Sequence, residues 1–229
     1  MAVDANFLTK VSLFETLPAH AQEQLARMMG ECVLRRGENL FDEGDPGDRL
    51  YVIVEGKIKL GHQEQRDGRE NLLAVLGPRE VLGELTLFDP GPRSTTATAI
   101  SPCKLYYLDH KDLMDFIEKN PSLAQEMLKA LAQRLRRTNE ALADLVFADV
   151  PGRVAKALLD LADRFGTRTE SGAIHVPHEL TQEELAQLVG ASRETVNKSL
   201  AHFVSRGWIH LEGRAVTLLD VEGLRRRAR

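Results

Sequence analysis

The sequence predicts an α+β fold, in which a small antiparallel β-roll, one long helix and a C-terminal pair of short helices with a β-hairpin follow one another. Short β-branched and aromatic runs punctuated by Gly and Pro extend from residue 32 to 108, and an unbroken helical pattern extends from 120 to about 147. Two capped helices follow after residue 180. We expect domains at 1–119 and 149–229, joined by a helix and hinge at 120–148.

The composition is that of an ordinary soluble globular protein, with 229 residues, 43% of them hydrophobic and 28% charged. The first 17 residues include Asp4, Lys10 and Glu15 and no long apolar run, so we expect no signal peptide, no membrane partner and a cytoplasmic location. Cys32 and Cys103 are too few for a four-thiolate metal site, and we expect buried free thiols.

The C-terminal part differs in charge from the rest of the chain. Residues 150–229 hold 12 Lys and Arg against 10 Asp and Glu, a net charge of +2, whereas the whole chain carries −4. The sign of this asymmetry favours a C-terminal part that meets phosphate groups.

The N-terminal half contains short strand patterns that alternate with turn signals. The strand patterns cover 50–54, 57–60, 71–76, 95–100 and 104–108. Turn signals rich in Gly and Pro stand at 44–47, 56, 67–68, 77–78 and 89–92. Such closely spaced short strands are typical of a compact antiparallel barrel or jelly roll.

The long helix has a heptad pattern. Asn120 and Pro121 supply a cap and a first-position proline, and no breaker follows until about residue 147. Steps of four and three residues link Ala124, Leu128, Leu131, Leu135, Thr138, Leu142 and Leu145. Since a strict heptad favours a partner helix, we expect a parallel homodimer whose interface includes Leu128, Leu131, Leu135, Leu142 and Leu145.

A helix-turn-helix pattern begins at Thr181, which forms a capping box with Glu184. The first helix ends at Gly190, where a turn requires positive φ, and Ser192 caps a second helix over 193–205. The hairpin pattern at 208–219 then adds a wing.

The exposed start of the second helix carries Arg193, Glu194 and Lys198. In such motifs these positions enter the DNA major groove, where a good side chain–base pair discriminates by ~1–3 kcal/mol. The remaining candidate DNA contacts are Thr181, Gln182, Ser192 and Thr195. From spacing alone, a generic helical hairpin with a solvated charged face is the alternative.

Two further C-terminal features have simpler interpretations. We expect Trp208 to be a core residue rather than a base-stacking one. We expect Arg225–Arg227 to form a solvated terminus, with non-specific phosphate contact as the alternative.

From end to end, the chain resembles the CRP/FNR family of transcription regulators, and most closely its actinobacterial cyclic-AMP receptor members. The motifs that carry the resemblance are Gly83-Glu84-Leu85, Asp89-Pro90-Gly91-Pro92-Arg93-Ser94, Arg134-Leu135-Arg136-Arg137-Thr138-Asn139, Asp149-Val150-Pro151-Gly152-Arg153, Val189-Gly190-Ala191-Ser192-Arg193-Glu194-Thr195-Val196 and Arg206-Gly207-Trp208-Ile209.

The resemblance implies a cyclic AMP site in the β-roll. Arg93 and Ser94 would bind the cyclic phosphate, Glu84 would accept from the ribose 2′-hydroxyl, and the backbone at Gly83 and Leu85 would approach the ligand. A Glu84–Arg93 salt bridge in an empty roll is the alternative.

The resemblance also assigns adenine recognition to the long helix. Thr138 would bind the adenine from one subunit, and the partner subunit's Asn139 would bind it from the other. The alternative for Thr138 is a polar residue that fixes the coiled-coil register. Asn139 stands where the family commonly has Ser, and Lys198 stands where the best-known member has Arg.

The implied function is that of an activator or repressor switched allosterically by cyclic AMP. A homodimer would bind double-stranded DNA at a TGTGA-N6-TCACA-type palindrome, with RNA polymerase as a partner through the loop at 166–172. The alternatives are a regulator of this family that senses another ligand or binds DNA constitutively, and, more remotely, a cupin-like metalloenzyme. Only His62 and His110 lie in or beside the roll, so we expect neither a metal nor an enzyme.

Overall fold

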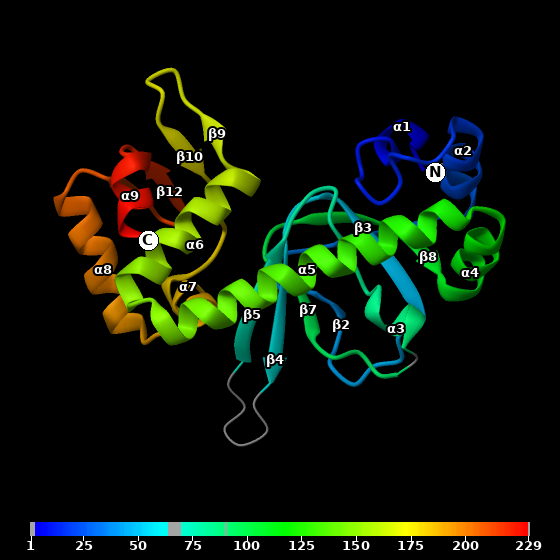
Figure 1. Cartoon of the computed structure of the whole chain (residues 1–229), viewed down its shortest axis with the longest axis horizontal. Helices are drawn as coiled ribbons and strands as arrows, with labels where there is room; N and C mark the ends of the chain where they lie inside the picture. Colours follow the sequence, from blue (N-terminus) through cyan, green and yellow to red (C-terminus); the bar gives the residue numbers. More distant parts are fainter. Residues whose placement is uncertain (1–2, 64–69, 90, 229) are drawn as a thin grey trace. The chain divides into compact units, whose positions relative to one another are not determined.

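The computed structural model describes residues 3–63, 70–89 and 91–228. The chain divides into two compact units (Figure 1): residues 1–70 with 74–137, and residues 71–73 with 138–229. The mixture of helices and antiparallel sheets confirms the predicted α+β class.

The first unit is a β-roll flanked by helices. Its helices are α1 (Ala5–Leu8), α2 (Ala19–Met28), α3 (Leu85–Phe88) and α4 (His110–Lys119), and its strands are β1 (Gly30–Leu34), β2 (Asn39–Phe41), β3 (Arg49–Glu55), β4 (Ile58–Gln63), β5 (Glu70–Leu76), β6 (Val81–Leu82), β7 (Thr96–Ala99) and β8 (Cys103–Asp109). Every predicted strand pattern overlaps one of these strands, whereas β1, β2 and β6 were not predicted, the last two being only three and two residues long. The turn predicted at 67–68 lies outside the described residues. The two sheets have the orders β1-β8-β3-β6 and β2-β7-β4-β5.

Two apolar clusters hold the first unit together. One joins the N-terminal helices to β3, β8, α4 and the start of α5 (Pro121–Phe147), and Phe14, Phe116 and Leu123 are fully buried in it. The other fills the interior of the roll around Ile53, Leu82 and Leu105. The roll is therefore a packed scaffold that fixes the loops at its ends.

Helix α5 runs from Pro121 to Phe147, as the sequence predicts. The amide of Asn120 donates to the carbonyl of Phe116 at 3.0 Å, so its side chain closes the end of α4. Leu123 and Met127 are buried against the first unit. On the predicted seam, Leu128 and Leu135 are 67% and 62% exposed.

The second unit is a winged helix-turn-helix. Its elements are α6 (Val150–Phe165), β9 (Thr167–Arg168), β10 (Ile174–Val176), α7 (Gln182–Leu188), α8 (Arg193–Ser205), β11 (Ile209–Glu212), β12 (Ala215–Leu218) and α9 (Val221–Arg227). The predicted hairpin pairs β11 with β12, and β10 and β9 extend it into a sheet of order β11-β12-β10-β9. Part of the predicted loop at 166–172 is thus strand β9.

The expectation of a solvated terminus at residues 225–227 holds for Arg225 and Arg226, which are exposed, whereas Arg227 is half-buried and pairs with Asp149. These arginines form the last turn of α9, which Asp220 caps by accepting from the Gly223 N–H at 2.8 Å. Leu224 is fully buried and anchors the helix. The Asp220 cap and the burial of Leu224 both stabilise this short helix, which has no apolar periodicity of its own.

Both cysteines are free thiols, with Cys103 buried and Cys32 partly buried. Within 3–63, 70–89 and 91–228, no helix has the length and apolar character needed to cross a membrane. The same described residues contain no group of three or more His, Cys, Asp or Glu arranged to hold a metal ion.

Candidate functional site

Arg93 is buried in the first unit, with 4% of its surface exposed. Its Nη1 donates to the Gly83 carbonyl and to Thr86 Oγ1, both at 3.2 Å, and its Nη2 donates to the Arg49 carbonyl at 2.9 Å. These acceptors are neutral. Neutral carbonyl and hydroxyl groups therefore hold the guanidinium in place, and none of them compensates its positive charge.

The charge of Arg93 favours an anionic ligand. In the described part of the chain no carboxylate forms an ion pair with Arg93, and its Nε is buried without a hydrogen-bond partner. Burial lowers the pKa of the guanidinium, although Tyr51, Asp48, Asp45 and Glu84 act in the opposite direction. A buried cation is costly unless an opposite charge reaches it, so the arrangement can bind an anion such as a phosphate.

Gly83 makes room for the Arg93 guanidinium. Its φ is +84°, and a Cβ at this position would lie 2.6 Å from Arg93 Nη1 and 2.7 Å from the Arg49 carbonyl oxygen. Positive φ and the lack of space both require glycine here. The resemblance implied a close approach of the backbone to a ligand; the neighbour that the structure places against Gly83 is the arginine itself.

Glu84 lies beside this arginine and is 8% exposed. Its Oε1 pairs with Nη1 of Arg134 on α5, and among the described residues no salt bridge joins Glu84 to Arg93. Its Oε2 is buried without a partner and can accept a hydrogen bond. The role of Arg134 was missed because 50 residues separate it from Glu84 in the sequence.

The structure brings together only some of the predicted ligand-binding residues. Gly83, Glu84 and Arg93 form one cluster, with Arg134 added. Leu85 and Ser94 directly follow Glu84 and Arg93 in the sequence, and both are exposed to solvent. Thr138 and Asn139 lie about one helical turn beyond Arg134, on the exposed part of α5 that belongs to the second unit.

The helix-turn-helix has the predicted caps. Thr181 Oγ1 accepts from the Glu184 N–H at 3.1 Å, and Glu184 Oε2 accepts from the Thr181 N–H at 2.8 Å. Ser192 Oγ accepts from the Thr195 N–H at 3.2 Å, and Gly190 has a φ of +64°. Because these hydrogen bonds link residues no more than four apart, the sequence pattern predicts them directly.

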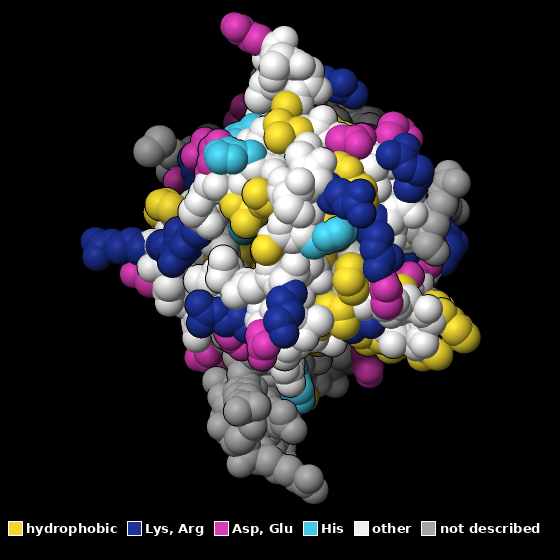
Figure 2. Space-filling model, turned by 90° about the vertical axis from the view of Figure 1, so that its left-hand side faces the viewer, with side chains coloured by type: hydrophobic (Ala, Val, Ile, Leu, Met, Phe, Trp, Pro, Cys, Tyr) yellow, Lys and Arg dark blue, Asp and Glu magenta, His cyan; other side chains and the backbone are white. Residues whose placement is uncertain are grey.

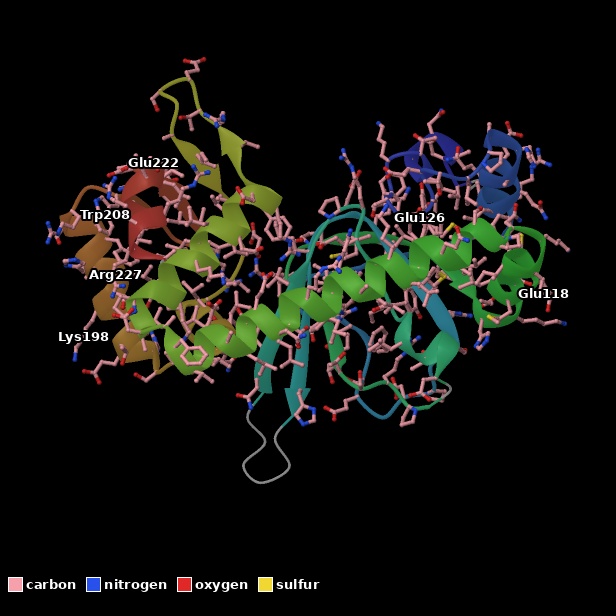
Figure 3. The ribbon with its side chains drawn as sticks, in the orientation of Figure 1. Glu118, Glu126, Lys198, Trp208, Glu222 and Arg227 are labelled. Atoms are coloured by element: carbon pink, nitrogen blue, oxygen red, sulfur yellow. The ribbon has the colours of Figure 1, made fainter. Side chains whose placement is uncertain are left out.

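The start of α8 presents its polar side chains to solvent. Arg193 and Glu194 are exposed, and Lys198 points away from the fold (Figure 3) and contacts Glu194 at 2.7 Å. Gln182 is exposed at the start of α7. An ion pair this exposed contributes ~0–1 kcal/mol, so DNA bases can replace it at little cost. Figure 2 shows Lys and Arg side chains spread among acidic ones over this end of the protein.

Arg153 connects the end of α5 to the turn of the helix-turn-helix. Its Nε donates to the Val189 carbonyl at 2.8 Å, Nη1 to the Ala148 carbonyl at 2.8 Å and Nη2 to the Gly190 carbonyl at 3.1 Å. The sequence identified Arg153 only as part of a motif and gave no sign of these partners, which lie up to 37 residues away.

Trp208 is partly buried, close to its expected role as a core residue. Its ring centroid lies 5.5 Å from that of Phe203, and a Cβ at Gly223 would lie 2.8 Å from its Nε1. Trp208 is the single tryptophan of the chain, so its fluorescence reports on the second unit alone.

Two known families match the two parts of the chain. The cyclic nucleotide-binding domain family matches residues 31–120, and the Crp-like helix-turn-helix domain family matches residues 152–227. Together with the buried arginine and the exposed start of α8, these matches define the class: a DNA-binding transcription regulator with a cyclic nucleotide-binding domain.

Relatives share this organisation over most of their length. A CRP-like cAMP-activated global transcriptional regulator of Mycobacterium tuberculosis is 52% identical over 222 residues, which cover 97% of this chain and 98% of the relative. The cAMP-activated global transcriptional regulator CRP of Escherichia coli is 31% identical over 180 residues, or 78% of this chain and 84% of the relative. The c-di-GMP-responsive global regulator CLP of Xanthomonas campestris has a solved structure that matches with a TM-score of 0.74 and 25% identity, covering 88% of this chain and 99% of that one.

The chain therefore belongs to the CRP/FNR family of transcription regulators, and it is not an enzyme.

Proposed function

We propose that this protein is a cyclic-AMP-responsive, homodimeric transcription regulator that binds DNA sequence-specifically. The observation that carries the ligand assignment is the buried Arg93 guanidinium, which has neutral acceptors only and an unpartnered Nε. The cAMP-activated relatives support cyclic AMP as the anion.

In this proposal the cluster of the first unit binds the cyclic phosphate and the ribose. Arg93 pairs with the phosphate, Ser94 adds its hydroxyl, and Glu84 Oε2 accepts from the 2′-hydroxyl. The backbone at Gly83 and Leu85 lines the site. Arg134 pairs with the other carboxylate oxygen of Glu84 and holds that side chain beside the ligand.

The adenine contacts are assigned to α5. Thr138 binds the base from one subunit, and the partner subunit's Asn139 binds it from the other. The Thr138 hydroxyl and the Asn139 amide each offer a donor and an acceptor. Asn139 places an amide where the family usually has a serine hydroxyl, and an amide presents its donor and acceptor at different positions. The ratio of the affinities for cyclic AMP and cyclic GMP should therefore be measured.

The dimer forms along the exposed face of α5. Leu128, Leu135, Leu142 and Leu145 are all more than half exposed in the single chain, and Leu131 completes the heptad spacing. Burying such a stripe against a second copy removes the apolar surface from water. Since ligand contacts and dimer contacts then lie on one helix, binding can shift the helix register and reposition the two recognition helices.

Each recognition helix α8 reads one half of a TGTGA-N6-TCACA-type palindrome. Arg193, Glu194 and Lys198 face the base edges, while Thr181, Gln182, Ser192 and Thr195 contact the backbone near the helix ends. The segment at 166–172 is the proposed contact for RNA polymerase, through which the protein activates or represses transcription.

A second candidate function is the sensing of another cyclic nucleotide. The Xanthomonas relative is described as responsive to c-di-GMP, which also offers phosphates to a buried arginine. Differential scanning fluorimetry with cyclic AMP, cyclic GMP and c-di-GMP separates the candidates, since the true effector stabilises the native state.

The substitution Arg93→Leu tests the ligand site. Removing the guanidinium should abolish cyclic AMP binding by calorimetry while α5 still dimerises in sedimentation. The matched control is Arg36→Leu, in which an exposed arginine of the same unit is replaced. Unchanged affinity in Arg93→Leu would overturn the assignment of the phosphate site.

The substitution Arg193→Ala tests the reading face. Losing a bidentate base contact should cost ~1–3 kcal/mol against the palindrome and leave non-specific binding nearly intact. Competition gel shifts measure this ratio, with Arg226→Ala as the control because Arg226 is exposed on α9. Intact sequence preference would show that other residues of α8 read the bases.

A further inference from the structure

The Arg93 guanidinium lies over the aromatic ring of Phe41. The Arg93 Cζ lies 4.4 Å from the centroid of the Phe41 ring and 5.9 Å from that of Tyr51. The two rings are packed together, with centroids 6.0 Å apart. The hydrogen bonds to Gly83, Thr86 and Arg49 fix the nitrogen atoms of the guanidinium, and its Cζ lies over the Phe41 ring.

Backbone hydrogen bonds join the segment that carries Phe41 to the segment that carries Arg93. Phe41 is the last residue of β2, next to a register irregularity between Asn39 and Phe41. Such irregularities re-aim side chains. In the turn that follows, the Gly44 N–H donates to the Arg93 carbonyl at 2.9 Å, and the Arg93 N–H donates to the Asp45 carbonyl at 2.8 Å. The turn after Phe41 and the backbone of Arg93 are thus paired in both directions.

We infer that Phe41 is a positioning residue for anion binding: its ring holds the Arg93 guanidinium in one place, so that a phosphate meets it without reorganisation. A flexible arginine would lose side-chain entropy on binding, whereas one already held over a ring has lost it beforehand. The ring also attracts the cation without neutralising it, as a carboxylate would. The inference rests on the proposed function, in which Arg93 binds the cyclic phosphate.

A simpler role for Phe41 is apolar packing in the roll, which would support the fold whatever Arg93 does. The two roles predict different couplings. If Phe41 acts through the guanidinium, the effect of its loss on ligand affinity depends on the guanidinium being present. If it only packs, the effect is the same with any cation at position 93.

A double-mutant cycle separates the two roles, with cyclic AMP as the probe in calorimetric titrations of the full-length protein. Phe41→Leu keeps an apolar side chain and removes the aromatic face, so cyclic AMP affinity should fall about tenfold. Phe41→Tyr restores that face and should bind within about twofold of the natural protein. In the Arg93→Lys background, which keeps the charge but not the plane, Phe41→Leu should change affinity by less than about twofold.

The control is Phe116→Leu, which makes the same change in the other apolar cluster of this unit, away from Arg93. It should leave cyclic AMP affinity unchanged while lowering the melting temperature. An equal loss from Phe41→Leu in the natural protein and in the Arg93→Lys background would overturn the positioning role, as would a loss in Phe41→Tyr or no loss in Phe41→Leu. If the natural protein does not bind cyclic AMP at all, the proposed function fails first and takes this inference with it.

Discussion

The substitution Arg153→Met removes the guanidinium that donates hydrogen bonds both to the residue after α5 and to the turn of the helix-turn-helix. It keeps most of the aliphatic part of the side chain. The two bonds to Val189 and Ala148 are partly buried, and the third, to Gly190, is exposed. A hydrogen bond from a charged donor contributes ~1.5–3 kcal/mol when buried, and less where water can replace it. We take the low end of that range for each of the two partly buried bonds and a negligible contribution from the exposed bond to Gly190. Arg153→Met should therefore lower the free energy of unfolding of the second unit by about 2–3 kcal/mol.

Urea unfolding followed by the fluorescence of Trp208 measures this loss in the second unit. For a unit of this size the urea slope is about 1–1.5 kcal/mol/M, so the midpoint should fall by about 2 M. The urea midpoint of Arg153→Lys should lie between those of the natural protein and of Arg153→Met, because a single ammonium group cannot donate to all three carbonyls as the planar guanidinium does.

Arg206→Met is the control, since Arg206 is exposed at the end of α8 in the same unit. A midpoint for Arg153→Met that matches the natural protein would refute the reasoning. So would an equal fall in Arg206→Met, because the loss would then come from removing any positive charge.

Two further predictions concern Gly83 and the Asp149 carboxylate. Gly83→Ala should weaken cyclic AMP binding at least tenfold in calorimetry, about 1.4 kcal/mol or more, because its Cβ would displace the Arg93 guanidinium. Gly44→Ala is the matched control, with a φ of +93° but nothing within 4 Å, and equal losses in both would point to backbone strain alone. Arg227 holds the pKa of Asp149 below its usual range, so this pair stabilises the fold above the ordinary carboxyl pKa and the contribution disappears as the pH falls through the lowered pKa. Arg227→Met should therefore lower the Trp208-monitored stability at pH 7 and converge with the natural protein in acid, whereas a pH-independent difference would contradict this linkage.

Much of the second unit could be predicted because its signals are local. The Thr181–Glu184 box, the Ser192 cap and the Gly190 turn each depend on neighbours within a few residues, so the sequence contains all that they need. The same holds for the spacing of Leu128 and Leu135, which places them on one face of α5 whatever surrounds it.

Local patterns were therefore enough to predict the order of the elements, the caps of the helix-turn-helix and the apolar seam, and resemblance to a family pointed to Glu84 and Arg93. The pairs of groups that meet were visible only in the folded chain: Arg134 with Glu84, Phe41 with the Arg93 guanidinium, and Arg153 with the Val189 and Gly190 carbonyls. These partners are 36 to 52 residues apart, as in Arg153–Val189 and Phe41–Arg93. A local pattern cannot encode such pairs, because they form only when sheets and helices that are distant in the sequence bury their apolar faces together.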